Sequence, residues 1–200
     1  MKKSTRPPLQ SQGELRLIGG TWRGRKLTFP LLPGVRPSGS RFRETLFNWL
    51  MPWIDGARCL DLFAGSGALG LEALSRGAHS ATFLDNAGPM IQNLHRNLSL
   101  LKANEASARQ TDALQWLTRE EALQGFDIVF VDPPFHQGLL TPVLEALQKP
   151  GILASQALIY FEAEKSLTLP PLPPGWQLHR HKSGGQVQYG LLHILPQDAS

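Results

Sequence analysis

At 200 residues and 42% hydrophobic content, the chain is long enough to bury one substantial core but short for two catalytic domains. Apolar runs reach only about six residues, so we expect neither a signal peptide nor a membrane span. The single cysteine, Cys59, excludes an internal disulfide and is predicted to be a buried strand residue. These features predict a cytoplasmic protein with one main domain.

Positive charge is concentrated at the N-terminal end. Residues 1–43 hold ten Lys and Arg against one acid, Glu14, so this segment carries +9 and residues 44–200 carry −5. Residues 1–12 are predicted to be a disordered basic tail. Beyond residue 12 the cations alternate with strand and helix formers, which predicts a folded surface that binds RNA phosphates. Its members are Arg16, Arg23, Arg25, Lys26, Arg36, Arg41 and Arg43.

The elements nearest the tail form a predicted N-terminal unit, residues 13–55. Two short strands, Leu15–Gly20 and Arg25–Phe29, are expected to pair as a basic hairpin around a glycine-containing turn. A helix is predicted from Arg41 to about Met51, with Ser40 as its cap.

Strands and helices alternate in residues 56–200, the predicted main domain. The predicted strands are Cys59–Phe63, Ser80–Asp85, Ala106–Gln110, Phe126–Val131 and Ala157–Phe161, followed by a closing hairpin of Trp176–Lys182 and Gln186–Ile194. The predicted helices are Ala68–Arg76, Pro89–Ala103, Ala113–Leu123 and Gln137–Leu147. This alternation predicts a Rossmann-like α/β fold, with a mostly parallel seven-stranded sheet covered by helices on both faces. Ligands in such folds bind beyond the carboxyl ends of the strands.

A glycine-rich turn follows the first of these strands. Gly65, Gly67 and Gly70 match the spacing of a dinucleotide-binding turn, although close packing of a helix on a strand also explains glycines there. Asp85 ends the next strand, where its carboxylate can accept hydrogen bonds from both hydroxyls of a ribose. Asp61 lies four residues before Gly65, at the C-terminal end of the first strand. An acid at this position would repel a pyrophosphate but attract the ammonium of a methionine moiety. The two acids therefore favour S-adenosylmethionine over NAD.

Asp112 follows the third strand of the main domain. It can accept the amino group of adenine or cap the next helix, and the sequence leaves both explanations open. No metal is expected at the site. The predicted cofactor contacts are Asp61, Phe63, Ala64, Gly65, Ser66, Gly67, Asp85, Asn86, Asp112 and Ala113.

The fourth strand delivers the predicted catalytic residues, Asp132-Pro133-Pro134-Phe135, to the same edge of the sheet. An exocyclic amine of a nucleobase is a poor nucleophile because its lone pair is delocalised, so the amine must be held and turned toward the methyl group. Asp132 can accept one N–H and the Pro133 carbonyl the other. Pro134 restricts the backbone, and Phe135 offers a face on which the base can stack. An ordinary strand-ending turn is the alternative explanation.

These segments together resemble the RsmD family, small bacterial methyltransferases that modify the N2 amine of a guanine in 16S ribosomal RNA. The resemblance covers nearly the whole chain. It depends on Arg16–Gly20 with Arg23–Leu27, on Arg36–Pro37 with Arg41–Asn48, on Asp61–Gly70, and on Asp132–Phe135. It implies a class I methyltransferase fold with S-adenosylmethionine as the methyl donor.

The resemblance also implies a substrate and one departure. The substrate would be 16S ribosomal RNA within the small ribosomal subunit or its assembly intermediate, with residues 36–48 packed over the cofactor and facing the RNA. Family members usually carry an acid where this chain has Ser40. We also expect a monomer, and His136 is predicted to be a loop residue.

Three other functions stay open. Another nucleic-acid amino-methyltransferase, acting on DNA or on another RNA guanine, shares the chemistry, but a DNA enzyme usually adds a sequence-reading domain. An NAD-dependent oxidoreductase fits the glycine spacing but not Asp61. A non-catalytic RNA-binding or assembly factor would keep the fold without the reaction.

Overall fold

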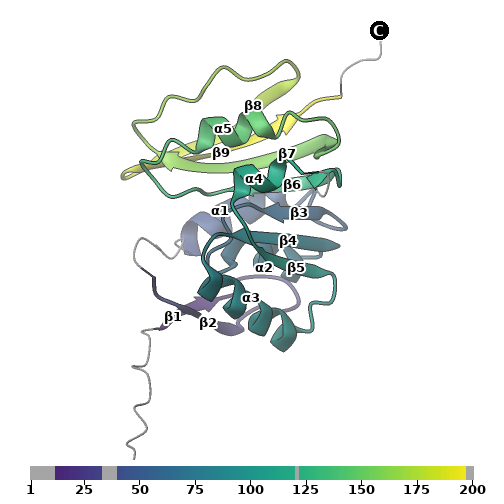
Figure 1. Ribbon diagram of the computed structural model, residues 1–200, viewed down its shortest axis with the longest axis vertical. Coiled ribbons are helices and arrows are strands. Elements are labelled where there is room, and N and C mark those ends of the chain that lie inside the picture. The colour runs from purple at the N-terminus through teal and green to yellow at the C-terminus, as the bar shows by residue number, and fades with distance from the viewer. Residues whose placement is uncertain (1–11, 33–39, 120–121, 197–200) are drawn as a thin grey trace, which may run out of the picture.

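The computed structural model describes residues 12–32, 40–119 and 122–196 (Figure 1). The strands are β1 (Gln12–Arg16), β2 (Lys26–Pro30), β3 (Arg58–Asp61), β4 (Ser80–Asp85), β5 (Ala106–Gln110), β6 (Phe126–Val131), β7 (Leu153–Glu164), β8 (Trp176–Gly184) and β9 (Val187–Ile194). The helices are α1 (Ser40–Leu50), α2 (Ala68–Ser75), α3 (Gly88–Leu101), α4 (Ala113–Leu117) and α5 (Leu140–Ala146). Within the described ranges, no helix has the length and apolar character needed to cross a membrane.

Seven strands form one sheet in the order β5-β4-β3-β6-β7-β9-β8. The first five strands of this order pair in parallel, whereas β9 pairs antiparallel with both β7 and β8. The predicted α/β fold with a closing hairpin is therefore confirmed. The chain passes outward from β3 to β5 and then returns to β6 beside β3, so the strand order reverses between β3 and β6. Ligands bind at such a switch point, beyond the carboxyl ends of the strands.

Alternate strand residues pack on opposite faces of the sheet. Cys59, Phe83 and Phe130 belong to a core shared with α1, α2 and α3, whereas Leu60 and Val129 pack with α4 and α5. Burying each such Phe or Leu side chain stabilises the fold by about 1.5–3 kcal/mol. The two apolar layers hold the strand ends in register, and this register positions the loops that follow the strands.

The N-terminal hairpin packs on the same face as α3. β1 and β2 pair antiparallel, and Leu15, Leu27 and Phe29 lie in the core that contains α1, α2 and α3. Asn93 and Asn97 of α3 donate side-chain hydrogen bonds to the Thr28 carbonyl oxygen, at 2.8 and 3.1 Å. The hairpin thus shares a core with the main sheet, and the predicted boundary near residue 55 stays a prediction.

Several predicted boundaries differ from the structure. The first strand ends at Arg16 and not at Gly20, because the next residues turn away to contact α2. Helix α4 ends at Leu117 instead of Leu123, and α5 begins at Leu140, after a turn in which Gly138 has a φ of +65°. The predicted disordered tail falls mostly on residues 1–11, which lie outside the described residues, whereas Gln12 already belongs to β1.

Candidate active site

The predicted site residues follow the carboxyl ends of four adjacent parallel strands. β3 ends at Asp61, β4 at Asp85, β5 at Gln110 and β6 at Val131. The turn after β4 is tied to its neighbours, since the Thr111 N–H donates to the Asp85 carbonyl oxygen at 3.0 Å. The structure therefore brings the glycine turn, the acids and the Asp132–Phe135 segment to one edge of the sheet. We call this edge the catalytic edge.

The three glycines of the turn have different roles. Gly65 has a φ of +51°, and a Cβ built on it would approach only the Phe63 carbonyl oxygen, at 4.0 Å. A Cβ on Gly67 would lie 2.4 Å from Leu94, and one on Gly70 would lie 2.3 Å from the Phe83 ring. Close packing thus explains Gly67 and Gly70, whereas Gly65 leaves space at the mouth of α2 where a ligand can approach the backbone.

Asp61 is a buried carboxylate at the end of β3. Its Oδ2 accepts the Gly70 N–H at 3.0 Å, so it joins the strand to the first turn of α2. Burial raises its pKa to about 7, with the charge of Asp85 adding to the rise and backbone N–H bonds from Gly70 and Phe63 opposing it. A cation near this position would favour the charged form. The predicted contact with an ammonium group stays a prediction.

Asp85 is hydrogen-bonded to the glycine turn. Its two carboxylate oxygens accept the N–H of Gly65 at 2.8 Å and the N–H of Ala87 at 2.7 Å. Each carboxylate oxygen has a second lone pair, so the same side chain can still accept hydrogen bonds from a ligand. The structure thus places the predicted ribose acceptor directly beside the open glycine.

Asp112 caps helix α4. Its Oδ1 accepts the Gln115 N–H at 2.8 Å, so the capping explanation is confirmed, and a contact with adenine stays a prediction. The remaining predicted cofactor residues lie in the same loops at the catalytic edge. Ala64 and Ala113 are buried, Phe63 and Ser66 are half-buried, and Asn86 is exposed.

The predicted catalytic segment directly follows β6. Asp132 and Phe135 are half-buried, Pro133 is buried and Pro134 is exposed. Phe130 pairs with Tyr160 of β7, so a residue two positions later faces the same side of the sheet as Tyr160. Burial and then Glu162 raise the pKa of Tyr160, and the charge of Asp132 contributes to the rise. Asp132 therefore lies on the α1 face of the sheet.

A buried pair beside this segment was missed from the sequence. The Tyr160 hydroxyl donates to Glu162 Oε1 at 2.6 Å, and burial raises the pKa of Glu162. The available signal was a glutamate inside an otherwise apolar strand, since charged residues are almost never buried without a partner. His136 was predicted correctly as a loop residue: its side chain is 80% exposed, with Nδ1 3.8 Å from Glu164 Oε1.

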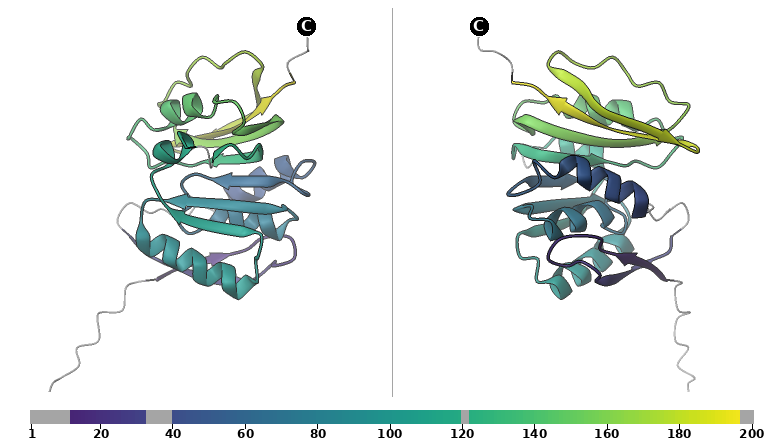
Figure 2. Two further views of the ribbon diagram at one scale, coloured as in Figure 1. Left: turned by 45° about the vertical axis from the view of Figure 1, so that its right-hand side comes forward. Right: turned by 180° about the vertical axis from the view of Figure 1, so that it is seen from behind.

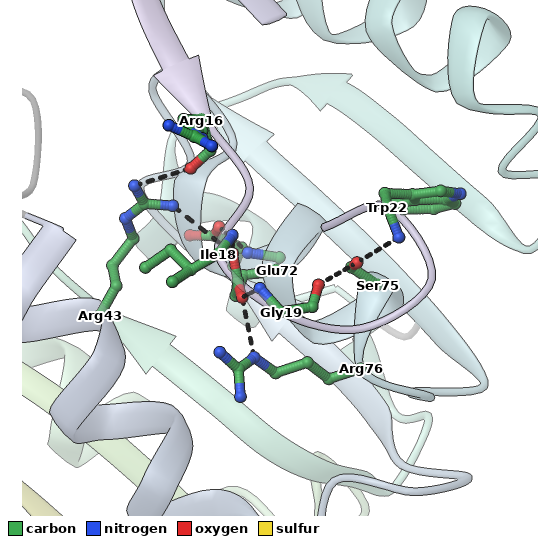
Figure 3. A network of polar contacts seen from close by, with 10 residues as sticks. Arg16, Ile18, Gly19, Trp22, Arg43, Glu72, Ser75 and Arg76 are labelled. Atoms are coloured by element: carbon green, nitrogen blue, oxygen red, sulfur yellow. Dashed lines mark hydrogen bonds and ion pairs between the residues drawn. The ribbon is translucent and has the colours of Figure 1, made fainter. Parts of the chain in front are cut away.

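Most of the predicted phosphate-binding residues lie on the surface, but one does not. Arg16, Arg23, Arg25, Lys26 and Arg41 are exposed, and Lys26 pairs with Glu14 at 3.1 Å. Arg36 lies outside the described residues. The prediction for Arg43 is wrong, because this side chain is buried and donates to the Arg16 carbonyl oxygen at 3.0 Å. Its NH1 also lies 3.6 Å from Glu72 Oε2 (Figure 3), so Arg43 supports the fold and cannot meet a phosphate.

The turn that carries Arg23 and Arg25 lies at the opposite end of α2 from the glycine turn. The Thr21 N–H donates to the carbonyl oxygen of Ser75, the last residue of α2, which places the turn with Arg23 and Arg25 at that end of the helix. The glycine turn lies at the other end of α2, about 12 Å away for eight helical residues. This basic turn is therefore distant from the catalytic edge.

Comparison with known proteins identifies the class and the family. Residues 15–193 match the family described as "Conserved hypothetical protein 95". Ribosomal RNA small subunit methyltransferase D of Escherichia coli strain K12 is 50% identical, over 96% of this chain and 94% of the relative. The solved structure of the putative methyltransferase yhhF from Escherichia coli matches with a TM-score of 0.83 and 50% identity, covering 92% of this chain and 100% of that chain.

A more distant match shows the fold alone. An RNA methyltransferase from Salinibacter ruber, solved in complex with S-adenosyl-L-homocysteine, has a TM-score of 0.58 and 14% identity, covering 82% of this chain and 97% of that chain. The strand order and these matches define a class I methyltransferase fold. Within that class, the chain belongs to the RsmD family. This membership removes the oxidoreductase alternative.

Proposed function

We propose that the chain transfers a methyl group from S-adenosylmethionine to the exocyclic N2 amine of a guanine in 16S ribosomal RNA of the small ribosomal subunit. The single observation that carries the proposal is the meeting of Asp132–Phe135 with the open glycine turn at one sheet edge. The relatives named ribosomal RNA small subunit methyltransferase D support the RNA substrate. The RNA would be methylated within the small ribosomal subunit or its assembly intermediate, and the enzyme would act as a cytoplasmic monomer without a metal.

The residues of the glycine turn fit S-adenosylmethionine. Gly65 leaves the space that a Cβ would fill, and the Asp85 carboxylate beside it can accept the ribose hydroxyls. The ammonium of the methionine moiety would lie toward Asp61, where burial raises the pKa of the carboxyl group and a positive charge would offset the cost of ionising it. When bound, the cofactor supplies an electrophilic methyl group on a positively charged sulfur.

The Asp132–Phe135 segment prepares the target amine. Asp132 accepts one N–H and the Pro133 carbonyl oxygen accepts the other, so the nitrogen lone pair is drawn out of conjugation and aimed at the methyl group. Phe135 stacks on the extruded base, which contributes about 1–3 kcal/mol. This offsets part of the few kcal/mol that base extrusion costs. With the cofactor bound, attack of the amine nitrogen on the methyl carbon would displace the sulfur, and the methylated nitrogen would then release one proton to solvent.

The test uses Asp132→Ala with small subunits prepared from a strain that lacks the endogenous activity. Methylated nucleosides are identified by mass spectrometry after digestion of the RNA. We expect N2-methylguanosine with the wild-type chain and a loss of at least about 100-fold in turnover with Asp132→Ala, as for removal of one preorganised group. Binding of S-adenosylhomocysteine by the variant should stay within about threefold, equivalent to less than 1 kcal/mol. Unchanged transfer, or methylation at another atom, would contradict the proposal.

A further inference from the structure

The C-terminal part of the chain has a one-sided charge. Residues 165–197 contain no Asp or Glu, although they span 33 residues and include both strands of the closing hairpin. The same segment holds Lys165, Arg180 and Lys182, together with His179, His181 and His193. Because the net charge of residues 44–200 is negative, this segment is a local exception with a positive potential.

The register of the sheet places the turn of this hairpin at the catalytic edge. Glu164, the last residue of β7, pairs with Val187, the first residue of β9, and Val187 also pairs with Gly184, the last residue of β8. The Lys165 N–H donates to the Gln186 carbonyl oxygen at 2.8 Å. β7 runs parallel to β6, so the turn between β8 and β9 projects beyond the same edge as Asp132.

Glu164, which pairs with the first residue of β9, also lies beside the loop that follows β6. Glu164 Oε1 lies 3.8 Å from Nδ1 of His136, the residue after Phe135. In the right-hand view of Figure 2, the β8–β9 turn and the start of α1 lie on the same side of the molecule. The turn is therefore next to the site, whereas the basic turn of the N-terminal hairpin lies beyond the opposite edge.

The lysines and the arginine of this segment are available to a partner. Lys165, Arg180 and Lys182 are exposed, and β8 is the outermost strand on its side of the sheet. Lys182 Nζ lies 5.8 Å from the centre of the Trp49 ring, which directs the side chain toward α1. A Cβ built on Gly184 or Gly185 would meet no atom within 4 Å among the described residues, so the turn has open space around it.

We propose that the β8–β9 hairpin and the residue that follows β7 beside it bind phosphates of the RNA strand that flanks the target nucleotide, through Lys182 and Lys165. The inference rests on the proposed function, because it takes RNA as the substrate. Residues 165–197 contain no acid and lie beside the catalytic edge, so their positive charge complements a polyanion. A neutral partner would gain little electrostatic energy from them. Lys182 lies three strand spacings from β6, about 14 Å. The hairpin therefore contacts neighbouring nucleotides and not the base that is methylated.

The test measures binding of the double variant Lys165→Ala, Lys182→Ala to unmethylated small subunits at several salt concentrations. Each lost phosphate contact should reduce the magnitude of the slope of log affinity against log salt by about 0.7–0.9. The slope of the double variant should therefore be smaller in magnitude by roughly 1.5. We expect KM for subunits to rise while kcat and the affinity for S-adenosylhomocysteine stay unchanged. Lys165→Gln, Lys182→Gln repeats the charge removal with longer side chains and should give the same result.

Arg96→Ala is the matched control, since Arg96 is an exposed cation on α3, at the other end of the sheet. It should leave both the slope and KM unchanged. If the wild-type chain methylates subunits but the double variant keeps its slope and KM, the inference on the hairpin is overturned and the proposed function stands. A raised KM with an unchanged slope would indicate contact with a ribosomal protein and would also overturn it. Absence of methyl transfer by the wild-type chain would instead contradict the proposed function.

Discussion

Glu72 and Asp61 are both buried carboxylates beside α2, but the structure compensates them differently. Glu72 is fully buried and accepts the N–H groups of Ile18 and Gly19 at 2.8 and 2.7 Å. It also accepts the Arg76 Nε–H at 2.8 Å and pairs with Arg43. Figure 3 shows these groups converging on its two oxygens. Glu72 thus connects the N-terminal hairpin and α1 to α2, which packs on the main sheet.

Asp61 has no comparable cation among its described contacts. Backbone N–H groups of Gly70 and Phe63 donate to it, and the charge that acts on its pKa belongs to another acid, Asp85. Burial raises the pKa of Asp61 to about 7, and the charge of Asp85 adds to the rise. A buried carboxylate whose cations come from the protein is part of the fold, whereas a buried carboxylate without a cation can accept a ligand that brings the positive charge.

The largest expected effect is at Glu72. Glu72→Gln keeps the shape but leaves the buried Arg43 without its counter-charge, so we expect the free energy of unfolding to fall by about 3–5 kcal/mol. Urea denaturation measures this change. Glu105→Gln removes an exposed carboxylate and should change stability by less than about 0.5 kcal/mol. If Glu72→Gln lowered the free energy of unfolding no more than Glu105→Gln does, Glu72 would not hold the N-terminal hairpin and α1 in place.

Gly70 and Gly65 give a second, smaller contrast between packing and binding. Gly70→Ala places a Cβ against the Phe83 ring and should cost about 1–3 kcal/mol of stability, with little change in affinity for S-adenosylhomocysteine. Gly65→Ala should cost about 1–2 kcal/mol through its positive φ. Gly65→Ala should also lower the affinity for S-adenosylhomocysteine at least about tenfold, or 1.4 kcal/mol, because the new Cβ fills the open space. Calorimetric titration and thermal unfolding separate the two effects, and equal ligand affinities would count against a cofactor at Gly65.

The sequence predicted the parts of this site that depend on local pattern. Alternating strands and helices placed the glycine turn, Asp85 and Asp132 at one sheet edge, because parallel strands bring their carboxyl ends together. The burial of Arg43 could not be predicted, since its partner Glu72 lies 29 residues later and meets it only through the packing of α1 on α2. The pair of Tyr160 and Glu162 is different, because the two residues lie two positions apart on one strand and the buried glutamate was a local signal that the sequence analysis did not use.

Asp61 gives the smallest expected effect, which depends on pH. Its folded pKa of about 7 lies above the unfolded value, so its contribution to stability is greatest below about pH 4 and is lost as the pH rises toward 7. A bound ammonium favours the ionised form. Affinity for S-adenosylhomocysteine should therefore increase from pH 6 to pH 7, by up to about fivefold, or about 1 kcal/mol.

Two controls isolate the role of Asp61 in this pH dependence. Asp61→Asn cannot ionise and should flatten the dependence, and 5′-methylthioadenosine, which lacks the ammonium, should bind the wild-type chain without it. Isothermal titration across this pH range measures both. A pH dependence that survives in Asp61→Asn would assign the effect to another group.

The central claim is that one sheet edge holds the cofactor and the amine-binding segment face to face. A crystal structure with S-adenosylhomocysteine tests it most directly. We predict that the ribose hydroxyls contact Asp85, and that the sulfur points toward the Asp132 carboxylate and the Pro133 carbonyl oxygen across a gap that admits one base. A ligand bound away from Gly65, or an Asp132 carboxylate turned away from the sulfur, would contradict the account.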